Sequence, residues 1–261
     1  MNEVPAGVVA VVTGASRGLG AGLARRLGER GLRLGLCARS IPAVPDRPGA
    51  SGVVTAGVDV TDAAEVASFA RAVADQLGPI GLWVNNAGVL DPVGPLAEAD
   101  PAEVARLLAV NVLGVVHGTQ AYARHVRSRP GGGVLLNVTS GAASTPYSGW
   151  APYCASKAAV DQLTRVVALE EASHGLRALS VSPGLVDTDM QARIRSAEPD
   201  RFPAVERFRR ASADGTFNSP AWVADAMLDL AFGTGSGAGT AGDVVARIPE
   251  EPGSDTRRSW Q

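Results

Sequence analysis

The chain has 261 residues, of which 46% are hydrophobic and 31 are glycine, and its formal net charge is -2. This length and composition predict one α/β domain with a large core. The small net charge argues against nucleic acid or an anionic membrane as a partner. Two cysteines, Cys37 and Cys154, form no disulfide framework or metal pattern, which favours a reducing, cytoplasmic location. We find no signal peptide and no apolar run of transmembrane length.

A glycine-rich turn follows the first predicted strand. Residues 8–12 are an apolar run typical of a buried parallel strand, the motif Thr13-Gly-Ala-Ser-Arg-Gly-Leu-Gly20 comes next, and residues 21–30 favour a helix. Gly14 lets the chain turn, and Gly18 and Gly20 let backbone approach a phosphate and pack the helix closely. The alternative is that the glycines form a turn without a ligand.

The second predicted strand, residues 32–37, leads to Arg39. NAD-binding folds commonly have an acidic residue here for the ribose 2′-hydroxyl. Arg39, together with Arg17 from the glycine turn, would instead suit a 2′-phosphate, which predicts NADP(H) as cofactor. The alternative is that both arginines are solvated surface residues.

The middle of the chain continues the alternation of strands and helices. Residues 41–52 are rich in proline and glycine, so we expect no full crossover helix there. Residues 53–58 and 80–84 are predicted strands, with an amphipathic helix over 62–77 between them. Asp59 and Val60 end one strand and are expected to face an adenine ring. Asn85-Asn86-Ala87-Gly88 ends the other with small residues that permit close backbone approach.

One long helix is expected over residues 101–129, and it contains Asn111 among apolar neighbours. A buried asparagine needs hydrogen-bond partners. Two interpretations stay open: a structural hydrogen bond, or a water molecule held for proton relay.

A possible acid/base pair follows the next strand, residues 134–139, which ends at Ser140. Tyr153 and Lys157 lie four apart and so share one face of a helix expected over 153–174. A free phenol has a pKa of about 10, which a neighbouring ammonium lowers, so Tyr153 can exchange a proton with a substrate oxygen. Lys157 is the single lysine among 24 basic residues, which favours a chemical role, although Tyr-x-x-x-Lys alone also occurs on ordinary helix surfaces.

The last part of the chain is expected to close over the site. A strand over 177–181 leads to Pro183-Gly184, a loop at the carboxyl edge of the sheet, where open α/β sheets bind ligands. An arginine-rich segment at about 189–215 is predicted to be a mobile helical lid. A helix over 221–232, a glycine-rich loop and a strand over 243–248 follow. The three histidines are scattered, and no metal site is predicted.

Taken together, these motifs resemble the short-chain dehydrogenase/reductase family over essentially the whole chain. The matching residues are Thr13-Gly-x-x-x-Gly18-x-Gly20, Asp59, Asn85 to Gly88, Asn111, Ser140, Tyr153-x-x-x-Lys157, and Pro183-Gly184 with Thr188. The resemblance implies a single Rossmann domain over residues 1–261, with a doubly wound, mostly parallel seven-stranded sheet and helices on both faces. It also implies hydride transfer between a nicotinamide and a carbonyl or alcohol carbon.

The resemblance assigns roles to individual residues. Tyr153 would be the acid/base, Lys157 would lower its pKa and bind the nicotinamide ribose, Ser140 would orient the substrate oxygen and Asn111 would hold a relay water. Thr188 and the Val186 backbone would hold the carboxamide. The full expected cofactor set is Gly14, Ser16, Arg17, Gly18, Leu19, Gly20, Arg39, Asp59, Val60, Asn86, Ala87, Gly88, Tyr153, Lys157, Pro183, Gly184, Val186 and Thr188.

Two stretches, Ala38-Arg39-Ser40 and Val186-Asp-Thr-Asp-Met-Gln191, are similar to the sepiapterin reductase and carbonyl reductase branch. In that branch an aspartate near the C-terminus anchors the substrate, and Asp243 is the best match. The expected substrate residues are Ser140, Ala142, Tyr147, Trp150, Leu185 and Asp243. They suit NADPH-dependent reduction of a ketone or dicarbonyl.

Two other functions stay open: a 3-oxoacyl or polyketide-type reductase whose basic lid meets a carrier, and an NADPH-binding redox sensor without turnover. The chain is also expected to form a homodimer or homotetramer. The reason is surplus apolar residues on the helices over 101–129 and 152–174, which pair across a two-fold axis in the family. These residues are Leu107, Leu108, Val112, Val115, Val116, Val160, Leu163, Val166, Val167 and Leu169.

Overall fold

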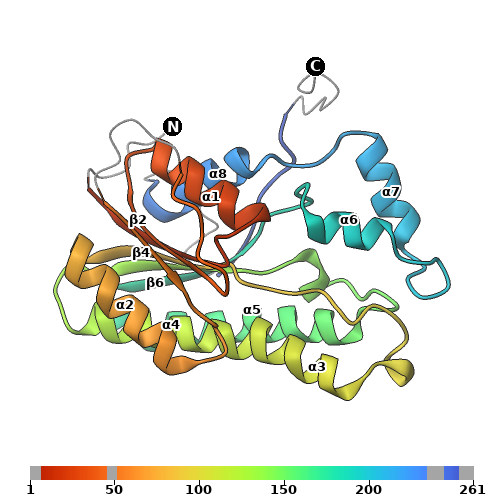
Figure 1. Cartoon of the computed structure of the whole chain (residues 1–261), viewed down its shortest axis with the longest axis horizontal. Helices are drawn as coiled ribbons and strands as arrows, with labels where there is room; N and C mark the ends of the chain where they lie inside the picture. The colour runs from red at the N-terminus through yellow and green to blue at the C-terminus, as the bar shows by residue number, and fades with distance from the viewer. Residues whose placement is uncertain (1–6, 46–51, 234–243, 253–261) are drawn as a thin grey trace.

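Seven parallel strands form one sheet at the centre of the protein (Figure 1). The computed structural model describes residues 7–45, 52–233 and 244–252. The sheet has the order β3-β2-β1-β4-β5-β6-β7, and every neighbouring pair is parallel. The strands are β1 (Val9–Thr13), β2 (Arg33–Ala38), β3 (Val53–Gly57), β4 (Ile80–Asn85), β5 (Gly133–Val138), β6 (Leu176–Ser182) and β7 (Val245–Arg247). The predicted doubly wound sheet is therefore confirmed.

Helices cover both faces of the sheet (Figure 1). One face packs against α1 (Gly18–Glu29) and α8 (Pro220–Phe232), and the other against α2 (Ala63–Leu77), α4 (Gly114–Arg127) and α5 (Ala151–Glu171). Because both faces are covered, the strands are continuous apolar runs, as in β1, where all five residues are buried.

The long helix expected over residues 101–129 is interrupted. It consists of α3 (Pro101–Leu108), a π-helical turn (Ala109–Leu113) and α4, which ends at Arg127. A π turn re-aims the side chains around it and is frequent at functional sites. Asn111 sits in this turn and is completely buried, so the interruption occurs where a polar side chain enters the core.

By length and composition the stretch Pro101–Arg127 could span a membrane, contrary to the prediction that no segment would. A single such helix is weak grounds for a membrane protein, since core helices pass the same test. Here Leu107, Val115 and Tyr122 point into the domain and are almost fully buried.

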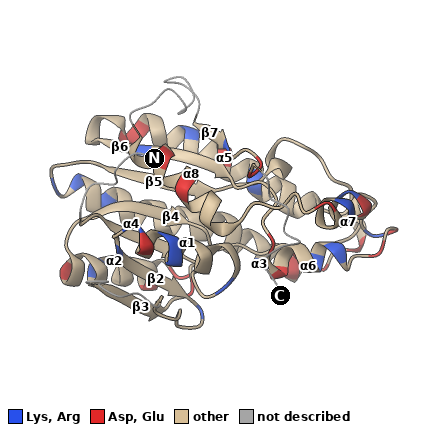
Figure 2. Ribbon diagram, turned by 90° about the horizontal axis from the view of Figure 1, so that it is seen from above, with Lys and Arg blue, Asp and Glu red and all other residues tan. Residues whose placement is uncertain are grey.

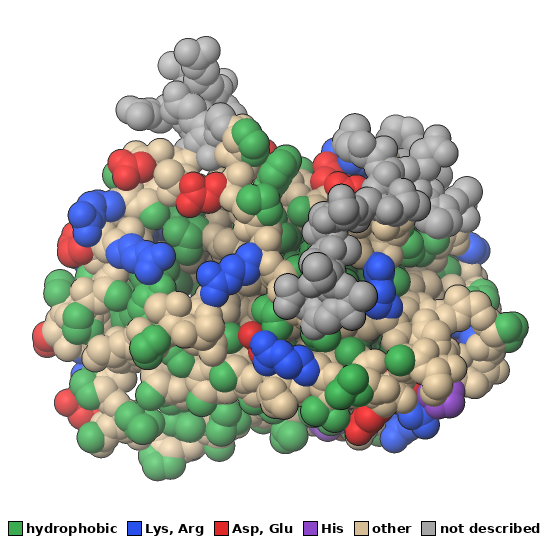
Figure 3. Space-filling model, turned by 180° about the vertical axis from the view of Figure 1, so that it is seen from behind, with side chains coloured by type: hydrophobic (Ala, Val, Ile, Leu, Met, Phe, Trp, Pro, Cys, Tyr) green, Lys and Arg blue, Asp and Glu red, His purple; other side chains and the backbone are tan. Residues whose placement is uncertain are grey.

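The surplus apolar residues of α3, α4 and α5 and of the π turn divide into three groups. Leu107, Val115, Val160 and Val167 are buried in the domain core, so assigning them to a subunit interface was wrong. Leu108, Val166 and Leu169 are exposed, at 38%, 40% and 81% of their surface. Figure 3 shows apolar side chains along the lower edge of the molecule, where these helices lie. The remaining predicted residues, Val112, Val116 and Leu163, are half-buried.

A row of buried polar side chains fixes α5 against the sheet. Asn85 of β4 donates to Asn137 of β5 at 2.9 Å, and Asn137 donates to Thr164 of α5 at 2.9 Å. The Trp83 indole N–H donates to Asn85 at 2.7 Å. Buried polar groups that are fully paired specify one arrangement of the elements that carry them. These bonds therefore set the position of α5 relative to the carboxyl ends of β4 and β5.

Two further helices, α6 (Asp189–Arg195) and α7 (Val205–Ala213), make up the predicted lid. They lie at one end of the molecule, to the right in Figure 1. Short 3₁₀ turns at Leu96–Glu98, Gly141–Ala143 and Ala172–His174 complete the described helical elements.

Candidate active site

The glycine turn after β1 packs directly against the loop after β4. A Cβ on Gly20 would lie 2.2 Å from the Gly14 carbonyl oxygen, and one on Gly14 would lie 2.7 Å from the Ala87 Cα. The Asn86 side chain donates to the carbonyl oxygens of Thr13 at 2.9 Å and Gly14 at 3.3 Å. Two of the segments predicted to hold the cofactor are thus joined, and only glycine fits where they meet.

The glycine turn and the adjoining loop after β4 are together called the cofactor cradle, and the rim of this cradle is open to solvent. Ser16, Arg17 and Gly18 are exposed and Leu19 is half-buried. A Cβ on Gly18 would lie 3.4 Å from the Thr188 side chain, so the loop after β6 reaches the glycine turn. Sequence motifs 170 residues apart therefore meet at the carboxyl edge of the sheet, where open α/β sheets bind dinucleotides.

Asn218, which the sequence patterns do not predict as a site residue, fixes the loop after β6. Its amide donates to the carbonyl oxygens of Pro183 at 2.9 Å and Pro249 at 3.2 Å. Its backbone pairs with Val186 in an isolated parallel bridge. A lone asparagine before a helix carries no signal of such a contact in the sequence.

Ser140, Tyr153 and Lys157 come together at the carboxyl end of β5. The Lys157 ammonium donates to the Val138 carbonyl oxygen at 3.0 Å and lies 5.8 Å from the centre of the Tyr153 ring. Tyr153 shares a hydrogen bond with Ser140. Tyr153 and Lys157 are buried, with 7% and 6% of their surfaces exposed. The constellation predicted from the motif therefore exists.

The ionisation of this pair differs from the prediction. Burial raises the pKa of Tyr153 to about 12, although its hydrogen bond with Ser140 acts in the opposite direction. Burial also lowers the pKa of Lys157 to about 8, partly offset by the charge of Asp161. The expected lowering of the Tyr153 pKa by Lys157 was wrong for this structure, because desolvation has the larger effect. Tyr153 is held as a neutral phenol, which is the form that donates a proton.

Asn111 has structural partners for its side chain. Its amide oxygen accepts from the Val89 N–H at 2.8 Å, and its amide nitrogen donates to the Val89 carbonyl at 2.9 Å and to Ser156 at 3.2 Å. A Cβ on Gly88 would lie 3.4 Å from the Asn111 oxygen and 3.7 Å from the Lys157 nitrogen. The side chain thus holds the loop after β4 beside Lys157, and the relay water stays a prediction.

Arg17 and Arg39 lie at the ends of the adjacent strands β1 and β2, and each has an acidic neighbour. Arg17 forms an ion pair with Asp189 at 3.3 Å, with 73% and 77% of the two side chains exposed. Arg39 is exposed and helps to lower the pKa of Asp59, mainly lowered by hydrogen bonds from Thr61. The predicted convergence of the two arginines on a 2′-phosphate stays a prediction.

The Asp59 carboxylate accepts from the Thr61 N–H at 2.9 Å and the Thr61 hydroxyl at 2.8 Å. Val60 is buried, and its carbonyl oxygen bonds to the His117 ring at 2.9 Å. Both residues lie in the segment between β3 and α2.

Aromatic rings line the space beside Tyr153. The Trp150 ring lies 5.5 Å from the Tyr153 ring and stacks on Phe202 at 4.3 Å. Tyr147 and Phe208 lie in the same cluster, their rings 6.0 Å apart. Ala142 and Leu185, both predicted to line the substrate pocket, pack there too. Asp243, the other predicted substrate residue, lies outside the described residues.

Phe202 and Phe208 come from the lid, and the sequence did not predict them as part of the aromatic wall beside Tyr153. Two phenylalanines in a segment otherwise rich in arginine are the signal that could have indicated a buried face. With Ile194 and Val205 they form the lid side of one apolar cluster that includes Trp150 and Tyr153. The lid therefore lies directly over the proposed acid/base.

Ion pairs connect the lid to the rest of the domain, and Figure 2 shows basic and acidic residues along α6 and α7. They join Arg193 to Asp91 at 3.0 Å and Arg201 to Glu98 at 2.9 Å, in addition to the Arg17–Asp189 pair. Arg207 of α7 donates to the Tyr147 hydroxyl at 3.0 Å. The segment is helical, as predicted, and in this structure it is docked on the domain, while its role as a substrate lid stays a prediction. Its mobility stays a prediction.

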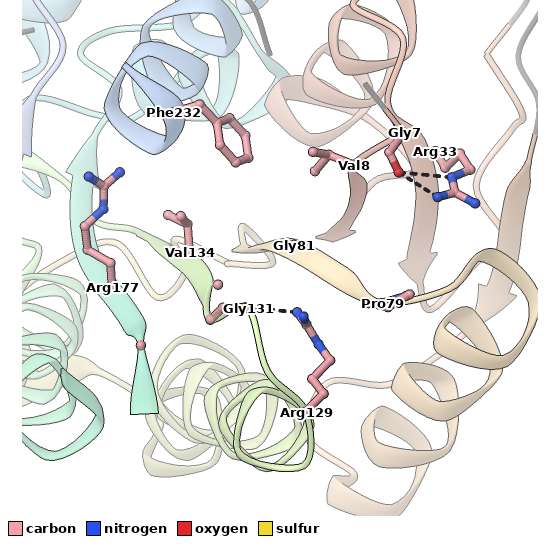
Figure 4. A pocket seen from close by; sticks show the side chains of 13 residues that line it. Gly7, Val8, Arg33, Pro79, Gly81, Arg129, Gly131, Val134, Arg177 and Phe232 are labelled. Atoms are coloured by element: carbon pink, nitrogen blue, oxygen red, sulfur yellow. Dashed lines mark hydrogen bonds between the residues drawn. The ribbon is translucent and has the colours of Figure 1, made fainter. Parts of the chain in front are cut away.

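The described residues also form a hollow of about 580 Å³ at the opposite edge of the sheet (Figure 4). It lies at the amino ends of β1, β4, β5 and β6, away from Tyr153. Its arginines, Arg33, Arg129 and Arg177, donate to the backbone carbonyls of Gly7, Gly132 and Ala231. These guanidinium groups support the loops at this edge, so we do not assign the substrate here.

No group of three or more His, Cys, Asp or Glu side chains within the described ranges could hold a metal ion. His117 contacts Val60 as above, and His125 accepts from the Ile80 N–H at 3.0 Å. These two histidines therefore have structural partners.

Comparison with known proteins gives a consistent result. A profile described as short chain dehydrogenase matches residues 8–199. A benzil reductase ((S)-benzoin forming) of Bacillus subtilis is 33% identical over 227 residues, covering 84% of this chain and 91% of the relative. A sepiapterin reductase of Meriones unguiculatus is 37% identical over 242 residues, covering 85% and 90%. The crystal structure of a short chain dehydrogenase from Burkholderia cenocepacia in complex with NADP has a TM-score of 0.72 and 30% identity, covering 94% and 89%.

Proposed function

The chain belongs to the short-chain dehydrogenase/reductase family of oxidoreductases, and from that premise we propose that it uses NADPH to reduce a ketone or dicarbonyl to an alcohol. The observation that carries the proposal is the cluster of Ser140, Tyr153 and Lys157 under an aromatic wall. The relatives named as benzil reductase and sepiapterin reductase support this choice among the reactions of the family.

The glycine cradle fits a dinucleotide, since side chains at Gly14 and Gly20 would clash with backbone. Bound there, the nicotinamide would supply the hydride. Ser16, Gly18 and Leu19 would hold the phosphates, Thr188 and the Val186 backbone the carboxamide, and Lys157 the ribose. Exposed Arg39 at the end of β2 would pair with a 2′-phosphate, which is our reason for preferring NADPH.

The residues around Tyr153 account for the proton. The neutral phenol donates its proton to the carbonyl oxygen of the substrate, and the Ser140 hydroxyl holds that same oxygen. The pKa of Lys157 is lowered only to about 8, so at neutral pH it is still mostly an ammonium. Its positive charge favours the phenolate that remains after the proton has left.

Stopped-flow measurement of NADPH oxidation tests the proposal. The panel contains simple ketones, vicinal diketones and 3-oxoacyl thioesters, each with NADPH and with NADH. We expect turnover with ketones or diketones that Tyr153→Phe abolishes. Turnover with the thioesters alone would favour the 3-oxoacyl reductase alternative, and tight NADPH binding without any turnover would favour the sensor.

We also propose that the protein is a cytoplasmic homo-oligomer, a dimer or tetramer. The support is the exposed apolar set Leu108, Leu113, Val166 and Leu169 on helices of one face, and two cysteines that are both unpaired. Light scattering at micromolar concentration measures the mass. Leu169→Glu should then yield a folded monomer, because Leu169 is 81% exposed and makes little contact with its own core. A monomeric wild-type mass would contradict this proposal.

A further inference from the structure

Buried polar atoms without a hydrogen-bond partner are concentrated at the lid. Among the described residues there are three such side-chain atoms: the Trp150 Nε1, the Gln191 Oε1 and the Arg195 Nη1. Gln191 and Arg195 lie on α6, and Trp150 lies in the wall on which the lid docks. Unpaired buried polar atoms are rare in proteins and require an explanation. Their position suggests that the lid closes over a ligand that pairs with them.

Trp150 gives the clearest case because the other described tryptophans differ from it. The Trp83 N–H donates to Asn85 at 2.7 Å, and the Trp222 N–H donates to the Pro249 carbonyl at 3.0 Å. Both of these indoles have an acceptor, as is usual for tryptophan. Trp150 is only 3% exposed and its N–H has no acceptor.

The surroundings of Trp150 explain why no acceptor is present. Its ring is covered by Phe202, stacked at 4.3 Å with an angle of 15°, and by Phe208 at 5.4 Å. Both phenylalanines belong to the lid segment. The polar backbone of Trp150 is satisfied locally: its N–H donates to the Tyr147 carbonyl at 3.1 Å, and its carbonyl accepts from Cys154 at 2.8 Å. Only the indole donor is left for a ligand.

The donor is also close to the proposed chemistry. Trp150 is the residue before the first turn of α5, and Tyr153 is three positions later. The two rings lie 5.5 Å apart at 68°. The Trp150 ring therefore packs edge-on against the ring of the proposed acid/base.

We propose that the Trp150 indole N–H is a specificity-determining donor for a second substrate oxygen, and that the preferred substrates are vicinal dicarbonyls with aromatic substituents. The inference rests on the proposed function and specifies its substrate class. In a vicinal dicarbonyl the second oxygen is one carbon away from the reacting carbonyl, so one oxygen can meet Tyr153 while the other accepts from Trp150. Aryl groups on such a substrate would pack against Tyr147, Phe202 and Phe208.

The test uses two matched substrates and two matched variants. Benzil and deoxybenzoin have the same two phenyl groups, but deoxybenzoin lacks the second carbonyl. Trp150→Phe removes the N–H and keeps an aromatic ring, and Phe202→Leu removes a neighbouring ring without removing a donor. Steady-state NADPH oxidation gives kcat/KM for each combination, and thermal unfolding verifies that each variant is folded.

We expect Trp150→Phe to lower kcat/KM for benzil about tenfold, the factor that one hydrogen bond between uncharged groups typically contributes, and to change that for deoxybenzoin less than twofold. Phe202→Leu should affect both substrates alike. A loss of equal size on both substrates with Trp150→Phe would mean that Trp150 serves only packing, and no loss on either would mean that the donor is unused. Either result overturns the inference.

A binding measurement separates this inference from the proposed function. If the wild-type protein reduces no ketone or diketone of the panel described above, the proposed function fails. Calorimetric titration with benzil and deoxybenzoin then decides about Trp150 on its own. Tighter binding of benzil that is lost in Trp150→Phe supports the donor, and equal binding of both compounds refutes it.

Discussion

The cofactor cradle and the lid are built on different principles. In the cradle, the side chains of Asn86, Asn111 and Lys157 each bond to backbone at 2.8–3.0 Å, so these three side chains have partners within the domain. The lid is attached by exposed ion pairs and stacked rings, and it contains or covers all three unpaired buried atoms of the described chain. We therefore expect folding alone to fix the geometry of the cradle, and a bound molecule to complete that of the lid.

Removal of the Tyr153 hydroxyl is expected to have the largest effect on turnover and to leave both the cofactor cradle and the lid in place. Tyr153→Phe keeps the ring against Trp150, so the wall and the fold should be unchanged. General acid catalysis contributes on the order of 10²–10⁴-fold, and kcat should fall by that factor. Stopped-flow kinetics measures the loss of turnover, and titration with NADPH measures whether cofactor binding is retained. Turnover close to wild type would refute the assignment of the acid.

The next largest effect is expected on the preference for NADPH over NADH. Arg39→Asp replaces an exposed cation at the end of β2 by an acid that suits a ribose 2′-hydroxyl. A charge-assisted contact to phosphate contributes about 1.5–3 kcal/mol, so the ratio of kcat/KM for NADPH over NADH should fall by roughly 10–100-fold. Equal kcat/KM for both cofactors in the wild-type protein would mean that Arg39 does not select the phosphate.

A smaller effect, on the free energy of unfolding, tests whether burial of the Lys157 ammonium destabilises the folded protein. Its pKa falls from 10.5 to about 8 on folding, so between these values the unfolded chain binds a proton that the folded protein releases. Stability contributed by this site therefore rises with pH. From pH 8 to 9.5, wild type should gain on the order of 1–2 kcal/mol relative to Lys157→Met. Urea unfolding at both pH values measures the free energy of unfolding of each protein. If that free energy changes equally with pH in wild type and Lys157→Met, the Lys157 pKa is not lowered.

The cradle could be predicted from sequence because its parts are local. A glycine at position 14 or 20 reports a close backbone approach directly, and Tyr153 and Lys157 share a helix face through their spacing alone. The π turn at Asn111 could not be predicted, since the Asn111 side chain bonds to Val89, 22 positions away in the chain, and no local pattern indicates that contact.

The lid was less predictable because its contacts are tertiary. Phe202 meets Trp150 across 52 positions of sequence, and no local pattern indicates that stacking. The ion pair of Arg17 with Asp189 joins residues 172 apart, and arginine residues are common throughout the chain. The pKa of Tyr153 was predicted in the wrong direction for a related reason: the motif shows the neighbouring ammonium but not the depth of burial.

The smallest effect is expected where cradle and lid meet, at the Arg17–Asp189 ion pair. With both side chains more than 70% exposed, the pair contributes roughly 0–1 kcal/mol. If NADPH draws Arg17 away from Asp189, then Asp189→Asn should tighten NADPH binding by at most about fivefold and leave NADH binding unchanged.

Asp187→Asn is the matched control, because it removes an equally exposed acid two residues away that pairs with Arg195 instead. Fluorescence titration at low and high salt measures both variants. A gain confined to Asp189→Asn and lost at high salt would couple the cofactor to the lid through Arg17, since exposed charges are screened by salt. Identical behaviour of the two variants would show that the lid is attached independently of the cofactor.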